Sequence, residues 1–119
     1  MLPEEKDSAY LWDMLQAAKE IESMLEDYDL SGFLANRVLL RATERCVEIL
    51  GESARRVSMT CREVHAEIPW REIIGQRNIL AHEYGQIDHE LLYKTVTNDI
   101  PRLIPTIEDL LPPLDETFE

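Results

Sequence analysis

Apolar residues recur every three or four positions along most of this chain, which is the spacing of an amphipathic helix. The first such stripe predicts a helix over residues 7–28, with Glu20, Glu22 and Glu26 off the apolar line. Its apolar positions are Leu11, Met14, Ala18, Ile21, Leu25 and Tyr28. Residues 29–32 then break the pattern. No segment alternates with a period of two, so we expect no strands.

A second helix is predicted over residues 33–57. Gly51 lies inside it, where a glycine costs about 1 kcal/mol relative to alanine and indicates a close helix crossing. The apolar seam of this helix consists of Leu39, Ala42, Cys46, Leu50 and Val57. A short third helix should follow, because Thr60 and Glu63 have the spacing of a capping box.

Two more helices complete the pattern. Pro69 suits the first position of a helix, where its missing N–H costs nothing, and Gly85 suits the residue after the last turn. The buried face of this fourth helix is expected to contain Trp70, Ile73, Ile74, Leu80 and Ala81. Asp88 is a candidate cap for the last helix. The apolar positions of that helix are Leu91, Leu92, Val96, Ile100, Leu103, Ile107 and Leu110.

Pro101 and Pro105 lie inside the last helical pattern. Each proline removes a backbone hydrogen bond, so we expect a kink near residues 97–101. Pro112 and Pro113 should end the helix. Four long helices and one short helix, joined by short loops, predict an all-α, up-and-down bundle that forms a single domain over residues 1–119.

Composition and charge narrow the possible functions. The chain has 119 residues, 45% of them hydrophobic, which allows a buried core without disulfides. Its net charge of -12 opposes promiscuous nucleic-acid binding, so an RNA partner would have to be held by a few local arginines and with strong salt dependence. No run approaches the roughly 20 apolar residues of a membrane span, and no signal peptide is visible. We therefore expect a cytoplasmic protein without membrane contacts.

Metal, disulfide and serine-nucleophile chemistry find little support in the sequence. Cys46 and Cys61 form neither a disulfide framework nor a metal-ligand spacing, and Cys46 is interpreted as a small buried hydrophobe. His65 and His89 lack a cysteine or carboxylate at metal spacing, so no zinc site is expected. The serines lie in no nucleophile elbow, and the sequence has no glycine-rich phosphate loop. We expect neither a metal nor a cofactor.

Arg77, His82 and Tyr84 concentrate the most chemistry in one short segment. Histidine titrates near neutrality, and a guanidinium suits a phosphate. The plainer interpretation is a histidine that the helix dipole favours near a C-terminus. Positions 77 and 82 diverge by about 140° on an ideal helix, whereas positions 77 and 84 nearly coincide. His82 therefore joins the others only if the helix loosens near Gly85 or a second subunit supplies the partner, and the spacing favours a composite site at a subunit interface.

Arg37, Arg41 and Arg45 form a second candidate, a stripe along the second predicted helix. Glu44, Glu48 and Glu52 follow the same spacing on an adjacent line. A solvated face with ion pairs inside the helix, each worth a few tenths of a kcal/mol, explains this pattern without a function. The functional alternative is that some of these arginines line the same cleft as Arg77 and attract phosphates.

Two runs of sequence carry a family resemblance. The first is Ile68-Pro69-Trp70-Arg71-Glu72-Ile73-Ile74-Gly75, followed by Arg77-Asn78 and His82-Glu83-Tyr84. The second, upstream run is Glu48-Ile49-Leu50-Gly51-Glu52-Ser53-Ala54. Together they resemble the HEPN superfamily, and more narrowly the HepT-like toxins of bacterial and archaeal toxin–antitoxin pairs. The likeness covers nearly the whole chain in length and helix order, and the two runs together are far more specific than an arginine–x4–histidine spacing alone.

The resemblance implies a homodimeric helical bundle in which two arginine–histidine pairs meet in one cleft. It also implies metal-independent endoribonuclease activity, with Arg77 and His82 as the catalytic pair. Arg41 and Arg45 of the arginine stripe, together with Asn78, are the candidate substrate contacts. Tyr84 would be the residue that a cognate minimal nucleotidyltransferase antitoxin modifies with AMP, as in type VII-like toxin–antitoxin systems. The alternative function is a non-catalytic helical module that binds a nucleotide or a protein.

Overall fold

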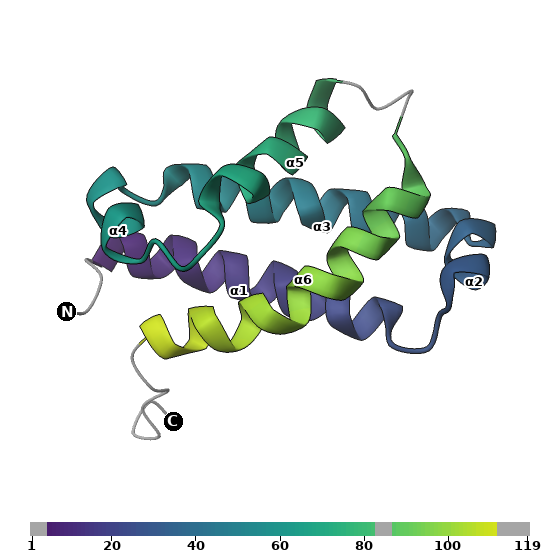
Figure 1. The fold of residues 1–119 in the computed structure, drawn as a ribbon, viewed down its shortest axis with the longest axis horizontal. Helices are drawn as coiled ribbons and strands as arrows, with labels where there is room; N and C mark the ends of the chain where they lie inside the picture. Colours follow the sequence, from purple (N-terminus) through teal and green to yellow (C-terminus); the bar gives the residue numbers. More distant parts are fainter. Residues whose placement is uncertain (1–4, 83–86, 112–119) are drawn as a thin grey trace.

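Six helices account for the regular structure in residues 5–82 and 87–111, which are the residues that this computed structural model describes (Figure 1). For residues 77–82 the backbone alone is described. The helices are α1 (Glu5–Leu25), α2 (Leu30–Ala35), α3 (Arg37–Arg56), α4 (Met59–Val64), α5 (Trp70–His82) and α6 (His89–Leu110). These ranges contain no strand. The predicted all-α bundle with four long helices is confirmed, and it has two short helices where the sequence indicated one.

The four long helices alternate in direction along the molecule (Figure 1). α1 packs on α3 and on α6, whereas α5 packs on α3. The short helix α2 contacts both α3 and α6, and in Figure 1 it lies at the opposite end of α3 from α4. α3 therefore packs against α1, α2 and α5 and lies at the centre of the bundle.

Most positions of the predicted apolar stripes lie in the core. Ala42 and Ile74 are only half-buried, and the side chains of Leu80 and Ala81 are not described. Five of the six stripe positions of α1 are buried, as are five of the seven positions of α6, while Leu110 is half-buried. Tyr28 is exposed, because α1 ends at Leu25 and Tyr28 lies in the turn that follows. Leu91 is also exposed, because its neighbour Leu92 occupies the buried position in the first turn of α6.

The predicted helix over residues 33–57 is wrong in one respect, because it is interrupted at Asn36, which separates α2 from α3. Asn36 has φ −108° and ψ 97°, outside the helical region, and its side chain accepts a hydrogen bond from Leu39 N at 3.0 Å. Asp29 caps α2 in the same way, accepting from Gly32 N at 2.8 Å. These two caps produce a short extra helix that buries Phe33 completely. The break that was expected over residues 29–32 is thus largely the start of α2.

The other predicted helix ends shift by one or two residues. α4 is capped by Ser58, whose hydroxyl accepts from Cys61 N at 3.1 Å, so the predicted Thr60–Glu63 capping box is wrong. Pro69 lies one residue before α5, and its carbonyl accepts from Ile73 N at 3.1 Å. Asp88 caps α6 as predicted, accepting from Leu91 N at 3.0 Å.

α6 continues through both of its prolines to Leu110. Neither proline can donate to the carbonyl four residues before it, so the carbonyls of Thr97 and Pro101 lose their helical donors. In Figure 1 the helix runs more steeply over its green first part than over its yellow end. The location of the kink near residues 97–101 stays a prediction. Gly85, Pro112 and Pro113, which were expected to end helices, lie outside the described residues.

None of the helices in residues 5–82 and 87–111 is both long enough and apolar enough to cross a membrane.

The buried carboxylate of Asp7 connects the first turn of α1 to the turn between α3 and α4. Asp7, on α1, is 5% exposed and accepts from Ser58 N at 2.8 Å and from Ser58 Oγ at 2.7 Å. Ser58 also caps α4, so the same hydroxyl connects Asp7 to the helix that follows. This arrangement holds the α3–α4 turn against the start of α1, which places the chain for its entry into α5.

We expect Asp7→Ala to lower the free energy of unfolding by about 1–3 kcal/mol, because it leaves the Ser58 N–H without its acceptor. Asp7→Asn should cost less, since its amide oxygen still accepts. Urea unfolding followed by circular dichroism measures both, with exposed Asp13→Ala on the same helix as the matched control. Equal stability of Asp7→Ala and Asp13→Ala would contradict this role for Asp7.

Candidate functional site

Positions 77 and 82 both lie in α5, which is helical from Trp70 to His82. Five residues of α-helix correspond to a rotation of about 140°, so the two positions lie on different faces of one helix. The side chains of both residues are not described, so a composite site at a subunit interface stays a prediction. Tyr84 lies outside the described residues.

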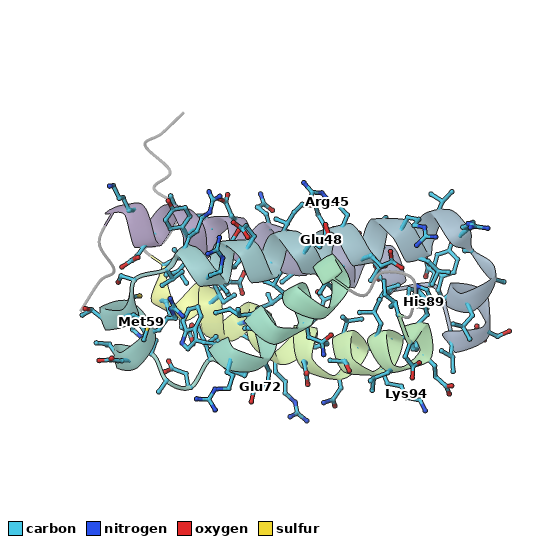
Figure 2. All side chains as sticks on the ribbon, turned by 90° about the horizontal axis from the view of Figure 1, so that it is seen from above. Arg45, Glu48, Met59, Glu72, His89 and Lys94 are labelled. Carbon is cyan, nitrogen blue, oxygen red and sulfur yellow. The ribbon has the colours of Figure 1, made fainter. Side chains whose placement is uncertain are left out.

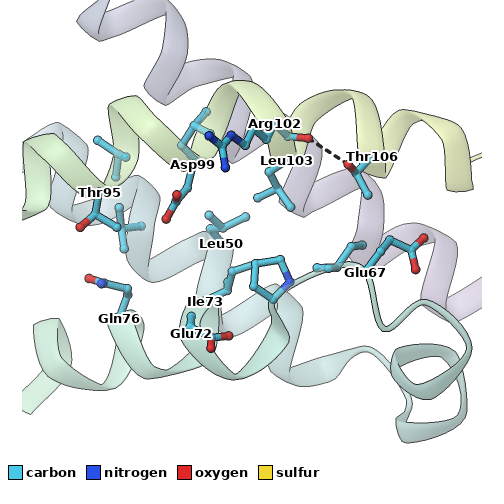
Figure 3. A pocket seen from close by; sticks show the side chains of 15 residues that line it. Leu50, Glu67, Glu72, Ile73, Gln76, Thr95, Asp99, Arg102, Leu103 and Thr106 are labelled. Carbon is cyan, nitrogen blue, oxygen red and sulfur yellow. Dashed lines mark hydrogen bonds between the residues drawn. The ribbon is translucent and has the colours of Figure 1, made fainter.

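A groove of about 350 Å³ separates α5 from α6, with α3 as its floor (Figure 3). Gln76, the residue before Arg77, lies at its edge. Apolar side chains form the inner surface: Val47, Leu50, Ile68, Ile73, Val96, Ile100 and Leu103. Because the apolar residues come from four parts of the chain, periodicity within one helix does not reveal the groove. Sequence reasoning missed it.

The rim of this groove is acidic. Glu67, Glu72 and Asp99 line it, against a single guanidinium, that of Arg102, among the lining residues described. Three carboxylates around an apolar floor oppose the approach of a phosphate. The groove is therefore not the arginine-lined cleft that the sequence predicted, because Arg37, Arg41 and Arg45 do not line it.

Two arginines of the α3 stripe, Arg41 and Arg45, are paired with glutamates of the same helix. Arg41 Nη1 lies 3.1 Å from Glu44 Oε1, and Arg45 Nη1 lies 3.1 Å from Glu48 Oε1. Both arginine side chains are more than half exposed, so these pairs stabilise the helix only slightly. The expected ion pairs inside the helix are confirmed. A guanidinium has five N–H donors, so each arginine keeps donors that could bind a phosphate.

Glu44 also contacts a residue on another helix. Its Oε2 contacts Nε2 of His89, the first residue of α6. Its Oε1 forms the ion pair with Nη1 of Arg41. Arg41, Glu44 and His89 therefore form one connected cluster across α3 and α6. Glu44 and His89 are 45 residues apart, so no local motif could have paired them. In Figure 2 His89 lies at the start of α6, beside α3.

The other described histidine has only a distant partner. His65 Nδ1 lies 3.9 Å from Glu67 Oε2. Among the described side chains, those of residues 6–76 and 87–111, no three His, Cys, Asp or Glu residues are grouped so that they could hold a metal ion. The side chain of Asn78, a candidate substrate contact, is not described.

Both cysteines are buried and free, which confirms Cys46 as a small buried hydrophobe. Burial raises the pKa of the Cys46 thiol, with a further rise from Glu20 and an opposing effect of Arg45. Burial, followed by the charge of Asp7, raises the pKa of the Cys61 thiol. A raised pKa leaves less thiolate at neutral pH, so neither cysteine is suited to act as a nucleophile.

We expect both native thiols to react slowly with a disulfide reagent such as DTNB at pH 8 and quickly after unfolding. Exposed Ser23→Cys supplies the control thiol that reacts quickly in the native state. Fast native modification of Cys46 or Cys61 would contradict this expectation.

The free energy of unfolding should fall as the pH rises above the ordinary thiol pKa of 9.0. The reason is that the thiols of the unfolded chain ionise there, while those of the folded chain keep their protons.

Comparison with known proteins identifies relatives over most of the chain. The family model described as "Ribonuclease HepT-like" matches residues 14–110. A Methanocaldococcus jannaschii protein named "Putative RNase MJ1380" is 37% identical over 100 residues, which cover 84% of this chain and 92% of that protein. The "Probable ribonuclease HepT" of Thermococcus cleftensis is 36% identical over 101 residues, which cover 85% and 92% of the two chains. No solved structure is matched significantly.

Proposed function

Because this chain belongs to the HepT-like ribonuclease family, we propose that it is a metal-independent endoribonuclease with Arg77 and His82 as its catalytic pair. The observation that carries this proposal is the family match over residues 14–110, which includes the whole of α5. The names of the relatives agree with it, since they too are named as ribonucleases.

The proposed active site lies at the interface of a homodimer. Its support is the helical register of α5, which puts positions 77 and 82 on different faces of one helix. In a two-fold dimer each arginine can face the histidine of the partner, so that two composite pairs form. Each protomer by itself would then hold an incomplete site.

The chemistry of RNA cleavage matches these two side chains. RNA is cut when its 2′-oxygen loses a proton and attacks the adjacent phosphorus, which releases the 5′-oxygen and leaves a cyclic phosphate. His82 can transfer a proton in this reaction, a role that typically contributes 10²–10⁴-fold. Arg77 can stabilise the charge that develops on the phosphoryl oxygens. The reaction requires no metal.

Substrate binding is assigned to Arg41, Arg45 and Asn78. The support for the two arginines is their exposure on α3, where each keeps free N–H donors despite its ion pair. Against a net charge of -12, a few local guanidinium–phosphate contacts must provide the attraction, so binding should weaken steeply with salt.

The biological role that we propose is that of a toxin in a type VII-like toxin–antitoxin pair. A minimal nucleotidyltransferase antitoxin would transfer AMP from ATP to the Tyr84 oxygen and release pyrophosphate. The added phosphate would repel the RNA backbone, and the adenosine would fill the space beside Arg77 and His82. Tyr84 lies in the segment that the family model matches.

We expect Arg77→Ala and His82→Ala each to lower RNA cleavage by at least about 10²-fold, because each removes a group that acts on the reacting phosphate. The assay incubates the purified protein with RNA in EDTA and detects cyclic-phosphate ends. Exposed Arg71→Ala, on the same helix, is the matched control and should keep full activity. Full activity of His82→Ala would exclude the proposed mechanism, and intact RNA with the wild-type protein would favour the non-catalytic module.

Coexpression with a cognate minimal nucleotidyltransferase should add AMP to Tyr84, since the phenol supplies the attacking oxygen. Intact mass and peptide mapping measure the increment, and Tyr84→Phe should stay unmodified but active as a ribonuclease. An unmodified wild-type chain in the presence of active nucleotidyltransferase would refute this regulation.

A further inference from the structure

We propose that His89, oriented by Glu44, is a second proton-transfer residue of the ribonuclease and accepts the proton of the attacking 2′-hydroxyl. This inference rests on the proposed function. It assigns a base to the reaction in addition to the Arg77–His82 pair, and it makes Glu44 a positioning residue. No motif in the sequence marks His89 as catalytic.

The contact between His89 and Glu44 determines which ring nitrogen is available. Glu44 Oε2 receives His89 Nε2, and an ionised carboxylate can only accept a hydrogen bond. Nε2 must therefore carry the hydrogen, and in the neutral ring the lone pair is on Nδ1. Among the side chains that are described, those of residues 6–76 and 87–111, none makes a hydrogen bond to Nδ1. This nitrogen is thus prepared to accept a proton.

The burial of the pair suits this role. The Glu44 side chain is 13% exposed and the His89 side chain is 25% exposed, so the carboxylate is largely shielded while the ring can still be reached. The contact with the carboxylate fixes the orientation of the imidazole ring, as the buried aspartate of a catalytic triad orients its histidine. The same carboxylate pairs with the exposed guanidinium of Arg41. This guanidinium provides a cation for a phosphate that lies next to the His89 ring.

A purely structural role for the pair is less well supported, because α6 has other anchors at this end. Tyr93 Oη donates to the Tyr28 carbonyl at 2.7 Å. The Tyr93 ring also packs on Phe33, with ring centroids 5.2 Å apart. These contacts join the first turns of α6 to α2 and to the turn before it, and they do not involve His89. The helix can be held in place without the histidine.

The position of His89 is compatible with a shared site. Six residues separate His82, the last residue of α5, from His89, the first residue of α6. In Figure 1 these two helix ends lie on the same side of the bundle, above α3. The His82 that completes the reaction can come from the same protomer or from the partner.

The proposed step is balanced in protons and bonds. The 2′-hydroxyl proton moves to Nδ1 of His89 as the 2′-oxygen attacks phosphorus. The bond from phosphorus to the 5′-oxygen breaks, and His82 donates a proton to that oxygen. The products are a 2′,3′-cyclic phosphate and a 5′-hydroxyl, and exchange with water restores both histidines. The reaction needs two proton transfers, and this assignment provides one group for each.

The decisive variant is His89→Gln, whose amide can still donate to Glu44 but cannot take up a proton. We expect its kcat on RNA to fall by about 10²-fold or more, with an unchanged thermal midpoint. The matched control is His65→Gln, the same substitution in the other described histidine that has a glutamate partner, and its kcat should be unchanged. Glu44→Gln should lower kcat with little change in KM.

A substrate with an activated leaving group separates the base from the acid. Uridine 3′-nitrophenyl phosphate releases nitrophenolate, which needs no proton donor. His82→Ala should therefore recover much of its lost activity on this ester, whereas His89→Gln should not. Recovery of His89→Gln on the ester, or an unchanged kcat on RNA, would overturn the assignment.

These variants test the ribonuclease function and the role of His89 separately. Cleavage by the wild type and its loss in His82→Ala test the proposed function, independently of His89. If both occur while His89→Gln is fully active, the ribonuclease stands and the inference about His89 fails. If His89→Gln does not fold, Glu44→Gln decides, because an unchanged kcat in that variant overturns the positioning role of Glu44 on which the inference depends.

Discussion

Packing of other helices onto the buried face of α3 is the constraint on which the rest of this structure depends. That face contributes Leu39, Cys46, Val47, Leu50 and Ala54 to the core, and α1 and α5 both pack against α3. Burial of a side chain of this kind stabilises a fold by about 1.5–3 kcal/mol, so displacing α3 would remove most of the core at once. The position of α5, and with it the positions of Arg77 and His82, follows from this contact.

The same helix also presents the polar groups of the proposed chemistry. Because α3 is buried along one side and exposed along the other, its arginines and glutamates form a row above the core. Most of these residues pair within the helix. Glu44 differs, since it reaches His89 at the start of α6 and joins two helices that are far apart in the sequence. The ion-paired surface of α3 thus also includes His89, whose ring is oriented by the Glu44 carboxylate.

Charge divides the molecule into two unlike regions. The groove between α5 and α6 has an apolar floor and an acidic rim, which is unfavourable for a phosphate backbone. Arg41 and Arg45, two exposed arginines, lie outside this groove, on α3. An RNA substrate is therefore expected to approach the arginine-bearing surface of α3 and not the groove between α5 and α6. This division explains how a chain with a net charge of -12 can be proposed to act on RNA.

The sequence by itself determined the helical class, the four long helices and most of the core, because a period of 3.6 residues is a local property of the chain. It also determined the family, through the runs around Arg77 and His82. Its errors at Asn36 and Ser58 were errors of capping, where one side-chain hydrogen bond decides where a helix starts. Only the tertiary structure decided the pairing of Glu44 with His89, the link from Asp7 to Ser58 and the groove beside α5. Each of these joins residues that are distant in the chain, and packing alone brings such residues together.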